Sequence, residues 1–341
     1  MRKLRVSIFG CLLLVMAAMS VAPARSQGLP SKKDAGPILE KAEAKMALTT
    51  PGAPPFYLVA KLHYRLGATG FDGVYELMWT APDRYREEFR LGQISSTYLA
   101  LGDKLYIQRN TPLLTYPQWR LRTMLGLPTP ALFAPKISVD KVSESQDGAT
   151  QLACAKMISP FGTETDCFTQ DTGNLVSMQF KMENLPISYT KENFADLGDY
   201  RFPKHILSII ANESLEVTLD KLMAARFSDD VFAPPAGAEV HDWCAKPDAG
   251  ERKGEDFYAW LSRQESLRPE GPQGSNSPQG FYIQVGKDGR VDTLSQMFRD
   301  GSSKPLNAKT AGSVRFGVLS CGGKPIDYEL NMAAVPPPPA P

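Results

Sequence analysis

The chain has 341 residues, 43% hydrophobic and 22% charged, a composition that excludes a wholly disordered or collagen-like protein. This length exceeds what one hydrophobic core usually organises, so two domains are expected. The formal net charge of +1 excludes the broad basic surface of a nucleic-acid-binding protein, and no apolar run beyond the N-terminus is long enough to cross a bilayer. We therefore expect neither a nucleic-acid partner nor a polytopic membrane protein.

The first 24 residues have the pattern of a signal peptide. Basic residues at 2–5 precede an apolar run at 6–18 that is short for a membrane-spanning helix, and small residues at 22–24 provide a cleavage site. We expect cleavage after Ala24, with cleavage after Ser26 as the second choice. The mature chain is then exported to the periplasm. An uncleaved anchor is the alternative.

Hydrophobic residues alternate with polar ones along most of the remaining chain, which predicts strands with one buried face. Turn residues such as those at 171–174 join them, as in an antiparallel sheet. The strands are expected around 56–65, 75–79, 84–91, 176–182 and 215–219. Helices are expected at 37–48, with Pro37 at the first helical position, at 119–125, bounded by Pro117 and Pro128, and at 255–266. The predicted class is mainly β with a few helices (α+β).

A domain boundary is predicted near residue 244, after the Pro-rich segment 233–237. Residues 243–278 form a helix and a Pro-, Gly- and Ser-rich linker, strand-type alternation resumes at 281–285, and 334–341 is a Pro-rich tail. The predicted domains are therefore 28–242 and 279–333.

Four cysteines remain after the signal peptide, an even number for an oxidising compartment. Cys154 and Cys167 flank a turn centred between 160 and 161, which places them opposite each other on two paired strands and predicts a disulfide. Cys244 and Cys321 remain for each other, and two free buried thiols are the alternative.

Motifs for catalysis or metal binding are absent from the sequence. The histidines are His63 on the polar face of a strand, His205 after Pro203-Lys204 and His241 in a boundary loop, and none belongs to a zinc or hydrolase motif. Glycine-rich phosphate loops are also missing. We therefore expect no enzyme, no cofactor and no metal site.

Residues 28–242 resemble the LolA-type periplasmic carriers of outer-membrane lipoproteins. The resemblance is carried by spaced segments at 75–79, 82–87, 102–106, 193–203 and 230–238. It implies an open antiparallel half-barrel with helices as a lid, whose apolar concave face receives acyl chains.

The apolar strand faces are the candidate site. The residues alone favour a filled core, since amphipathic strands nearly always bury that face; the resemblance implies an open groove, which is the expectation adopted here. Its predicted lining is Phe56, Leu58, Leu62, Tyr64, Leu77, Trp79, Tyr85, Phe89, Leu91, Val176, Met178, Phe180 and Met182, and its predicted lid is Trp119, Leu121 and Leu125.

Residues 279–333 resemble the C-terminal domain of TonB-type energy transducers. The matching segments are 281–285, 287–291, 307–311, 314–316 and 322–326. The resemblance implies a small α+β fold with a peptide-binding edge. The chain departs from the transducers because its N-terminal segment is predicted to be cleaved and a folded domain replaces their long spacer.

The expected protein is a periplasmic, non-enzymatic carrier that holds a lipid or lipoprotein acyl chain, with a C-terminal interaction module. The alternative is a TonB-system or envelope scaffold, whose C-terminal domain binds an outer-membrane or envelope partner while the N-terminal domain is structural.

Overall fold

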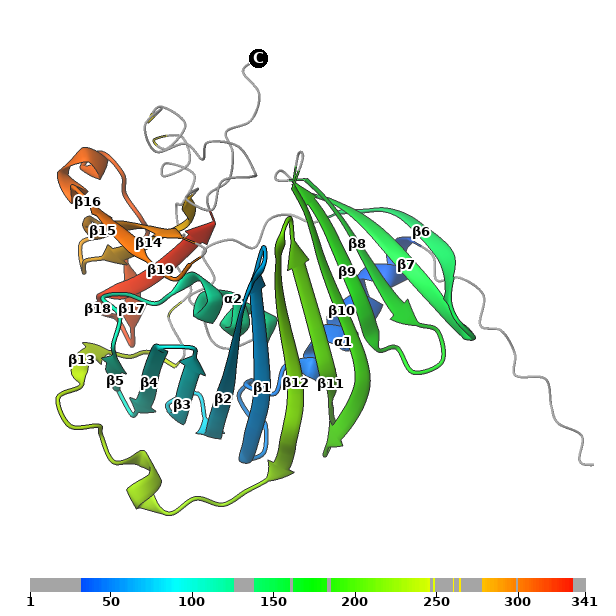
Figure 1. Cartoon of the computed structure of the whole chain (residues 1–341), viewed down its shortest axis with the longest axis horizontal. Helices are drawn as coiled ribbons and strands as arrows, with labels where there is room; N and C mark the ends of the chain where they lie inside the picture. Colours follow the sequence, from blue (N-terminus) through cyan, green and yellow to red (C-terminus); the bar gives the residue numbers. More distant parts are fainter. Residues whose placement is uncertain are drawn as a thin grey trace, which may run out of the picture.

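A computed structural model describes residues 32–125, 138–159, 162–182, 185–245, 248, 260, 264, 278–298 and 300–333 (Figure 1). The predicted signal peptide and the Pro-rich tail lie outside these residues, as does most of the helix predicted at 255–266 and of the linker after it. No helix in the described part of the chain is both long and apolar enough to span a membrane.

The main element is an open antiparallel sheet of 13 strands, in the order β13-β5-β4-β3-β2-β1-β12-β11-β10-β9-β8-β7-β6. The chain runs through β1–β5, crosses to the far edge at β6, and returns strand by strand until β12 pairs with β1. The strands are β1 (Phe56–Leu66), β2 (Thr69–Ala81), β3 (Arg84–Leu91), β4 (Ile94–Leu101), β5 (Lys104–Arg109), β6 (Ser138–Asp147), β7 (Thr150–Ser159), β8 (Gly162–Thr169), β9 (Leu175–Met182), β10 (Leu185–Leu197), β11 (Tyr200–Ile210), β12 (Glu213–Ala224) and β13 (Glu239–Asp242). The expected mainly β, open antiparallel architecture is therefore confirmed.

Two helices, α1 (Lys32–Met46) and α2 (Tyr116–Met124), pack against one face of this sheet (Figure 1). Both begin earlier than predicted. Pro37 lies inside α1 and is not its first residue, and Pro117 lies in the first turn of α2, where a missing N–H is tolerated, so it does not bound the helix.

The face under the helices carries two separate hydrophobic clusters. Beneath α2, side chains of β1–β5, β11 and β12 form a large core that includes Leu121 and Leu125 of the helix. Beneath α1, Leu39 and Ala42 pack on side chains of β7, β8 and β9. Each helix therefore completes its own core.

The C-terminal part forms a four-stranded sheet in the order β16-β15-β14-β19, together with a two-stranded sheet, β17-β18. A hydrophobic cluster of its own contains Phe281, Ile283, Leu330 and the buried Trp260. Its elements are β14 (Pro278–Val285), β15 (Val291–Phe298), β16 (Ser303–Leu306), β17 (Leu319–Cys321), β18 (Lys324–Ile326), β19 (Tyr328–Ala333) and the short 3-10 helix η3 (Ala308–Ala311). The strand predicted at 281–285 is confirmed; the TonB-like assignment stays a prediction.

The C-terminal sheet contacts the beginning of α2. Tyr282 and Met297 form a small buried cluster with Tyr116 of the helix. A second contact joins the turn after β14 to β13, where Lys287 Nζ and Asp242 Oδ2 form an ion pair of 3.3 Å. The helix that covers the main core is thus also in contact with the C-terminal sheet (Figure 1).

Both predicted disulfides are present. Cys154 on β7 and Cys167 on β8 are directly paired in the strand register, with a Cα–Cα distance of 4.0 Å. Cys244 and Cys321 join the segment after β13 to β17, with a Cα–Cα distance of 5.9 Å.

Candidate functional site

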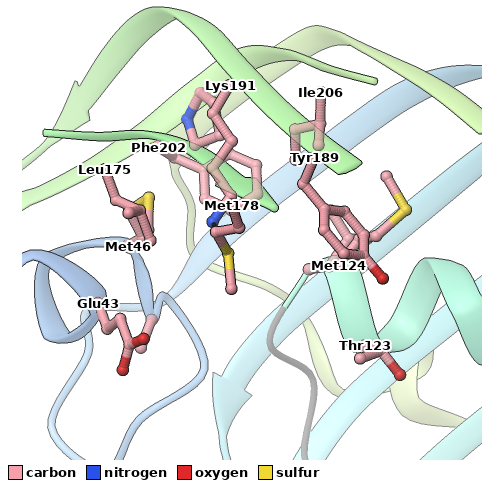
Figure 2. A pocket seen from close by; sticks show the side chains of 13 residues that line it. Glu43, Met46, Thr123, Met124, Leu175, Met178, Tyr189, Lys191, Phe202 and Ile206 are labelled. Carbon is pink, nitrogen blue, oxygen red and sulfur yellow. Dashed lines mark hydrogen bonds between the residues drawn. The ribbon is translucent and has the colours of Figure 1, made fainter. Parts of the chain in front are cut away.

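A pocket of about 360 Å³ lies where the ends of α1 and α2 approach each other over the sheet (Figure 2). This volume is in the range of small-molecule sites. Nine of the thirteen lining residues are apolar. The lining comprises Glu43, Met46, Ala47, Thr123, Met124, Leu125, Leu175, Met178, Tyr189, Lys191, Phe202, Pro203 and Ile206.

The pocket lies between the two hydrophobic clusters. Leu125, Phe202 and Ile206 belong to the core under α2, whereas Leu175 belongs to the core under α1. Because each helix completes a separate core, the sheet between them is left uncovered where the helices end. The pocket is therefore a consequence of how two short helices share one broad sheet.

Three methionines line the pocket from three different elements: Met46 from α1, Met124 from α2 and Met178 from β9. Figure 2 shows Met178 and Tyr189 reaching from the strands toward the space between the helices. Methionine is unbranched and has three rotatable side-chain bonds, so such a wall adapts to apolar ligands of different shape.

The predicted groove residues of β1–β3 lie in the filled core beneath α2. Trp79 and Tyr85 stack with ring centroids 5.5 Å apart, and Phe56 stacks on Trp79 at 6.2 Å. None is more than 2% exposed; they are Phe56, Leu58, Leu62, Tyr64, Leu77, Trp79, Tyr85, Phe89 and Leu91. Of the predicted lid, Leu121 is part of this core, Trp119 packs against it, and Leu125 also lines the pocket.

On β9 the structure brings only part of the predicted face to the pocket. Met178 lines it, as does Leu175, while Val176 and Phe180 are half-buried elsewhere; the side chain of Met182 lies outside what the structure describes. The register between β8 and β9 skips Val176, because Cys167 pairs with Ser177 and Phe168 pairs with Leu175. This bulge shifts the alternation by one residue, which a strict period of two does not predict.

Helix α2 is attached to the sheet by buried charged side chains. Arg120 forms an ion pair with Glu213 of β12 and donates a hydrogen bond of 2.7 Å to Ser208 Oγ. Arg122 lies 3.5 Å from Glu87 of β3, and burial raises the pKa of that carboxyl group. The helix is therefore positioned by specific partners as well as by apolar packing.

A further charged group lies on the pocket wall. Lys191 of β10 is 9% exposed, and its Nζ lies 3.4 Å from Met178 Sδ. Burial lowers the pKa of Lys191, while the carboxylates of Asp166, Glu43 and Glu164 act in the opposite direction. Burial, with Glu164 nearby, raises the pKa of Asp166 to about 8.

Sequence reasoning missed these charged residues, although a signal was present. Glu87 lies on the same strand face as Tyr85 and Phe89, and Glu213 has the same relation to Leu215 on β12. A charged residue at a buried position of an alternating strand indicates a buried partner.

The prediction that His241 lies in a boundary loop is wrong. His241 lies in strand β13.

No family model and no curated protein matches this chain. Solved structures give distant likenesses. A LolA superfamily protein from Nitrosomonas europaea is 11% identical with a TM-score of 0.38, over 58% of this chain and 97% of that one. A putative outer membrane lipoprotein-sorting protein domain from Vibrio parahaemolyticus is 9% identical with a TM-score of 0.41, over 59% and 97%. The MucA/MucB complex of Pseudomonas aeruginosa includes a chain 11% identical with a TM-score of 0.24, over 85% and 95%.

The class that the fold and the site define is a mainly β protein with an open antiparallel sheet, two covering helices and an apolar pocket between them. The likenesses are distant, so they carry no conclusion about the chemistry of the pocket.

Proposed function

We propose that this protein is an exported, non-enzymatic binding protein that holds a lipid or lipoprotein acyl chain in the pocket between α1 and α2. The observation that carries the proposal is the pocket itself, with nine apolar residues among thirteen and three methionines from separate elements. Transfer of each CH₂ group from water into such a site stabilises the complex by roughly 0.8 kcal/mol. A single acyl chain is therefore sufficient for binding in water.

Two features support export to an oxidising compartment. The N-terminal residues 1–24 have the pattern of a signal peptide. Both disulfides are formed, and disulfides persist in the periplasm and outside the cell but are rare in the cytosol. We propose the periplasm as the location.

We propose that the side chains predicted to line a groove on β1–β3 serve instead to hold α2 on the sheet. Its side chains are already in contact with one another and with Leu121, so an acyl chain would reach them only after α2 left the sheet. The buried pairs of Arg120 and Arg122 oppose that movement. A ligand can enter the pocket between α1 and α2 without such a movement, and we propose this pocket as the binding position.

A substitution that fills the pocket tests the proposal. Ala47 is half-buried and lines the pocket directly after α1, so Ala47→Trp places an indole in the space that the acyl chain would occupy. Ala44→Trp is the matched control, because Ala44 is exposed in the last turn of α1 and does not line the pocket. Native mass spectrometry of the mature protein with added lauric acid should show the complex for the unmodified chain and the control, and its loss for Ala47→Trp. Equal binding by both variants, or no binding by any, would contradict the proposal.

We also propose that residues 279–333 are a separate domain with an interaction role. Their own hydrophobic cluster supports the first part. In the sheet order β16-β15-β14-β19, strand β19 pairs on one side only among the described strands, which supports an edge open to a partner strand. Binding of an envelope protein by the whole chain, lost on Asn331→Pro, tests this role.

A further inference from the structure

We propose that the ligand of the pocket is an anionic amphiphile, an acyl chain that ends in a carboxylate or phosphate group, and that the Lys191 ammonium binds this group. The inference rests on the proposed function and specifies its substrate class. It is carried by the position of Lys191 on the wall of an otherwise largely apolar pocket.

Lys191 is a buried cation without a close carboxylate partner. Its side chain is 9% exposed, and the hydrogen-bond neighbour of Nζ in the described part of the chain is a thioether sulfur, Met178 Sδ, at 3.4 Å. Among the described residues, no carboxylate oxygen lies within 4.0 Å of this ammonium group. Buried charged groups are otherwise paired, since an unpaired one loses its hydration without compensation.

The pocket has room for an anionic partner of Lys191 beside its ammonium group. Lys191 and Met178 both line the cavity, so an anion entering it can approach Nζ directly. Figure 2 shows the Lys191 amine beside Met178, on the strand side of the space between the helices. An acyl chain along Met46 and Met124 could therefore direct its acid group to Lys191.

Nearby carboxyl groups modify this attraction but do not replace it. Glu43 reaches the pocket from α1, and Glu164 and Asp166 lie beneath α1 on β8; β9, β11 and the end of α2 contribute no charged side chain to the lining. Because burial raises the pKa of Asp166 to about 8, its carboxyl group is largely neutral at pH 7. Its repulsion of an anionic ligand is then small, and it grows as the pH rises.

Three probes with equal chains separate the possibilities: laurate, dodecyl phosphate and lauryl alcohol, each titrated below its aggregation threshold. The full mature chain should bind at least one of the two acids at least about tenfold more tightly than the alcohol. A preference between laurate and dodecyl phosphate identifies the acid as a carboxylate or a phosphate. Equal affinity for both acids and the alcohol would overturn the inference while leaving the proposed function intact; no binding of any probe would contradict the proposed function.

Variants assign the effect to Lys191. Lys191→Met keeps an unbranched apolar stem and removes the charge, so it should weaken binding of the acids at least about tenfold and leave that of lauryl alcohol unchanged. Lys204→Met is the control, because Lys204 is exposed and does not line the pocket, although it directly follows the lining residue Pro203. An acid affinity unaffected by Lys191→Met would contradict the assignment.

A measurement on the unmodified chain covers the case in which Lys191→Met does not fold. Between about pH 6 and about pH 9, Asp166 becomes ionised and Lys191, whose pKa is lowered, loses its proton more readily. Both changes weaken binding of laurate, which keeps a single negative charge over this range, and leave lauryl alcohol unaffected. A laurate affinity that stays constant or rises over this range would contradict the inference.

Discussion

Arg120 of α2 and Glu213 of β12 form an ion pair in which the side chains are only 2% and 0% exposed. The two residues are far apart in the sequence, and their contact fixes the helix across the centre of the sheet. The edge of the pocket at Thr123, Met124 and Leu125 follows in the next turn of the same helix. The buried pair therefore determines where the pocket ends.

Removing one partner of this pair should destabilise the protein strongly. Arg120→Met leaves the Glu213 carboxylate buried without its ion pair, and Glu213→Gln leaves the guanidinium in the same position. Each substitution should lower the free energy of unfolding by about 3–5 kcal/mol, measured by urea titration.

The exposed pair of Lys61 and Asp220, 3.6 Å apart, provides the control. Lys61→Met should lower the free energy of unfolding by less than about 1 kcal/mol, because solvent screens this pair. If Arg120→Met were as mild as Lys61→Met, the buried pair would not anchor α2.

Asp166 should make the stability depend on pH. Its pKa of about 8 in the folded chain lies above the value of about 3.9 for an unfolded chain, so the folded state binds the proton more tightly. The stabilisation is complete below about pH 4 and is lost as the pH rises through about 8. Asp166→Asn should therefore show a smaller decrease in melting temperature between about pH 5 and about pH 9 than the unmodified chain.

Asp147→Asn is the matched control for Asp166→Asn, because Asp147 is exposed at the β6–β7 turn. Asp147→Asn should retain the pH profile of the unmodified chain. An Asp166→Asn profile that matched it would show that burial of Asp166 has no effect on its protonation.

The two disulfides should differ in their contribution to stability. They close loops with sequence separations of 13 for Cys154–Cys167 and 77 for Cys244–Cys321. Chain entropy of the unfolded state predicts losses of about 3 and about 4.5 kcal/mol when each pair is replaced by alanine. Urea titrations of the two double variants measure the difference; a larger loss for the shorter loop would contradict this reasoning.

Two glycines should differ in how well they tolerate alanine. A Cβ on Gly73 of β2 would lie 2.1 Å from the carbonyl oxygen of Arg90, so Gly73→Ala must displace β3. Apart from its chain neighbours and the helix backbone, a Cβ on Gly36 of α1 would meet no atom within 4 Å, so the higher helix propensity of alanine is opposed there only by the ring of the adjoining Pro37. The melting temperature should fall for Gly73→Ala and change little for Gly36→Ala; an equal fall for both would contradict the packing described here.

The alternation of apolar residues predicted the strands well because each strand has one buried face. Phe56 to Tyr64 on β1 and Tyr85 to Leu91 on β3 follow this rule, and the pairing of Cys154 with Cys167 follows from the turn between them. These are local properties. They require no knowledge of what lies above the sheet.

The pocket could not be predicted in the same way, because it depends on where two helices end over strands from distant parts of the sequence. Alternation identifies the apolar face but does not say that α2 fills it at Trp79 and leaves it open at Met178. The bulge at Val176 also shifted the face of β9. One signal for the pocket was present in the sequence. Lys191 is a charged residue that follows Ile187 and Tyr189 on one face of β10, where an apolar residue is expected.

The central claim, that the gap between α1 and α2 holds an acyl chain, is tested most directly by methyl NMR of methionine-labelled protein titrated with laurate. Met46, Met124 and Met178 line the gap, and Met223 on β12 is 54% exposed outside it. We predict that the first three methyl signals shift and show contacts to the laurate chain, while Met223 does not change. Binding of laurate that leaves all three pocket methyl signals unchanged would contradict the account.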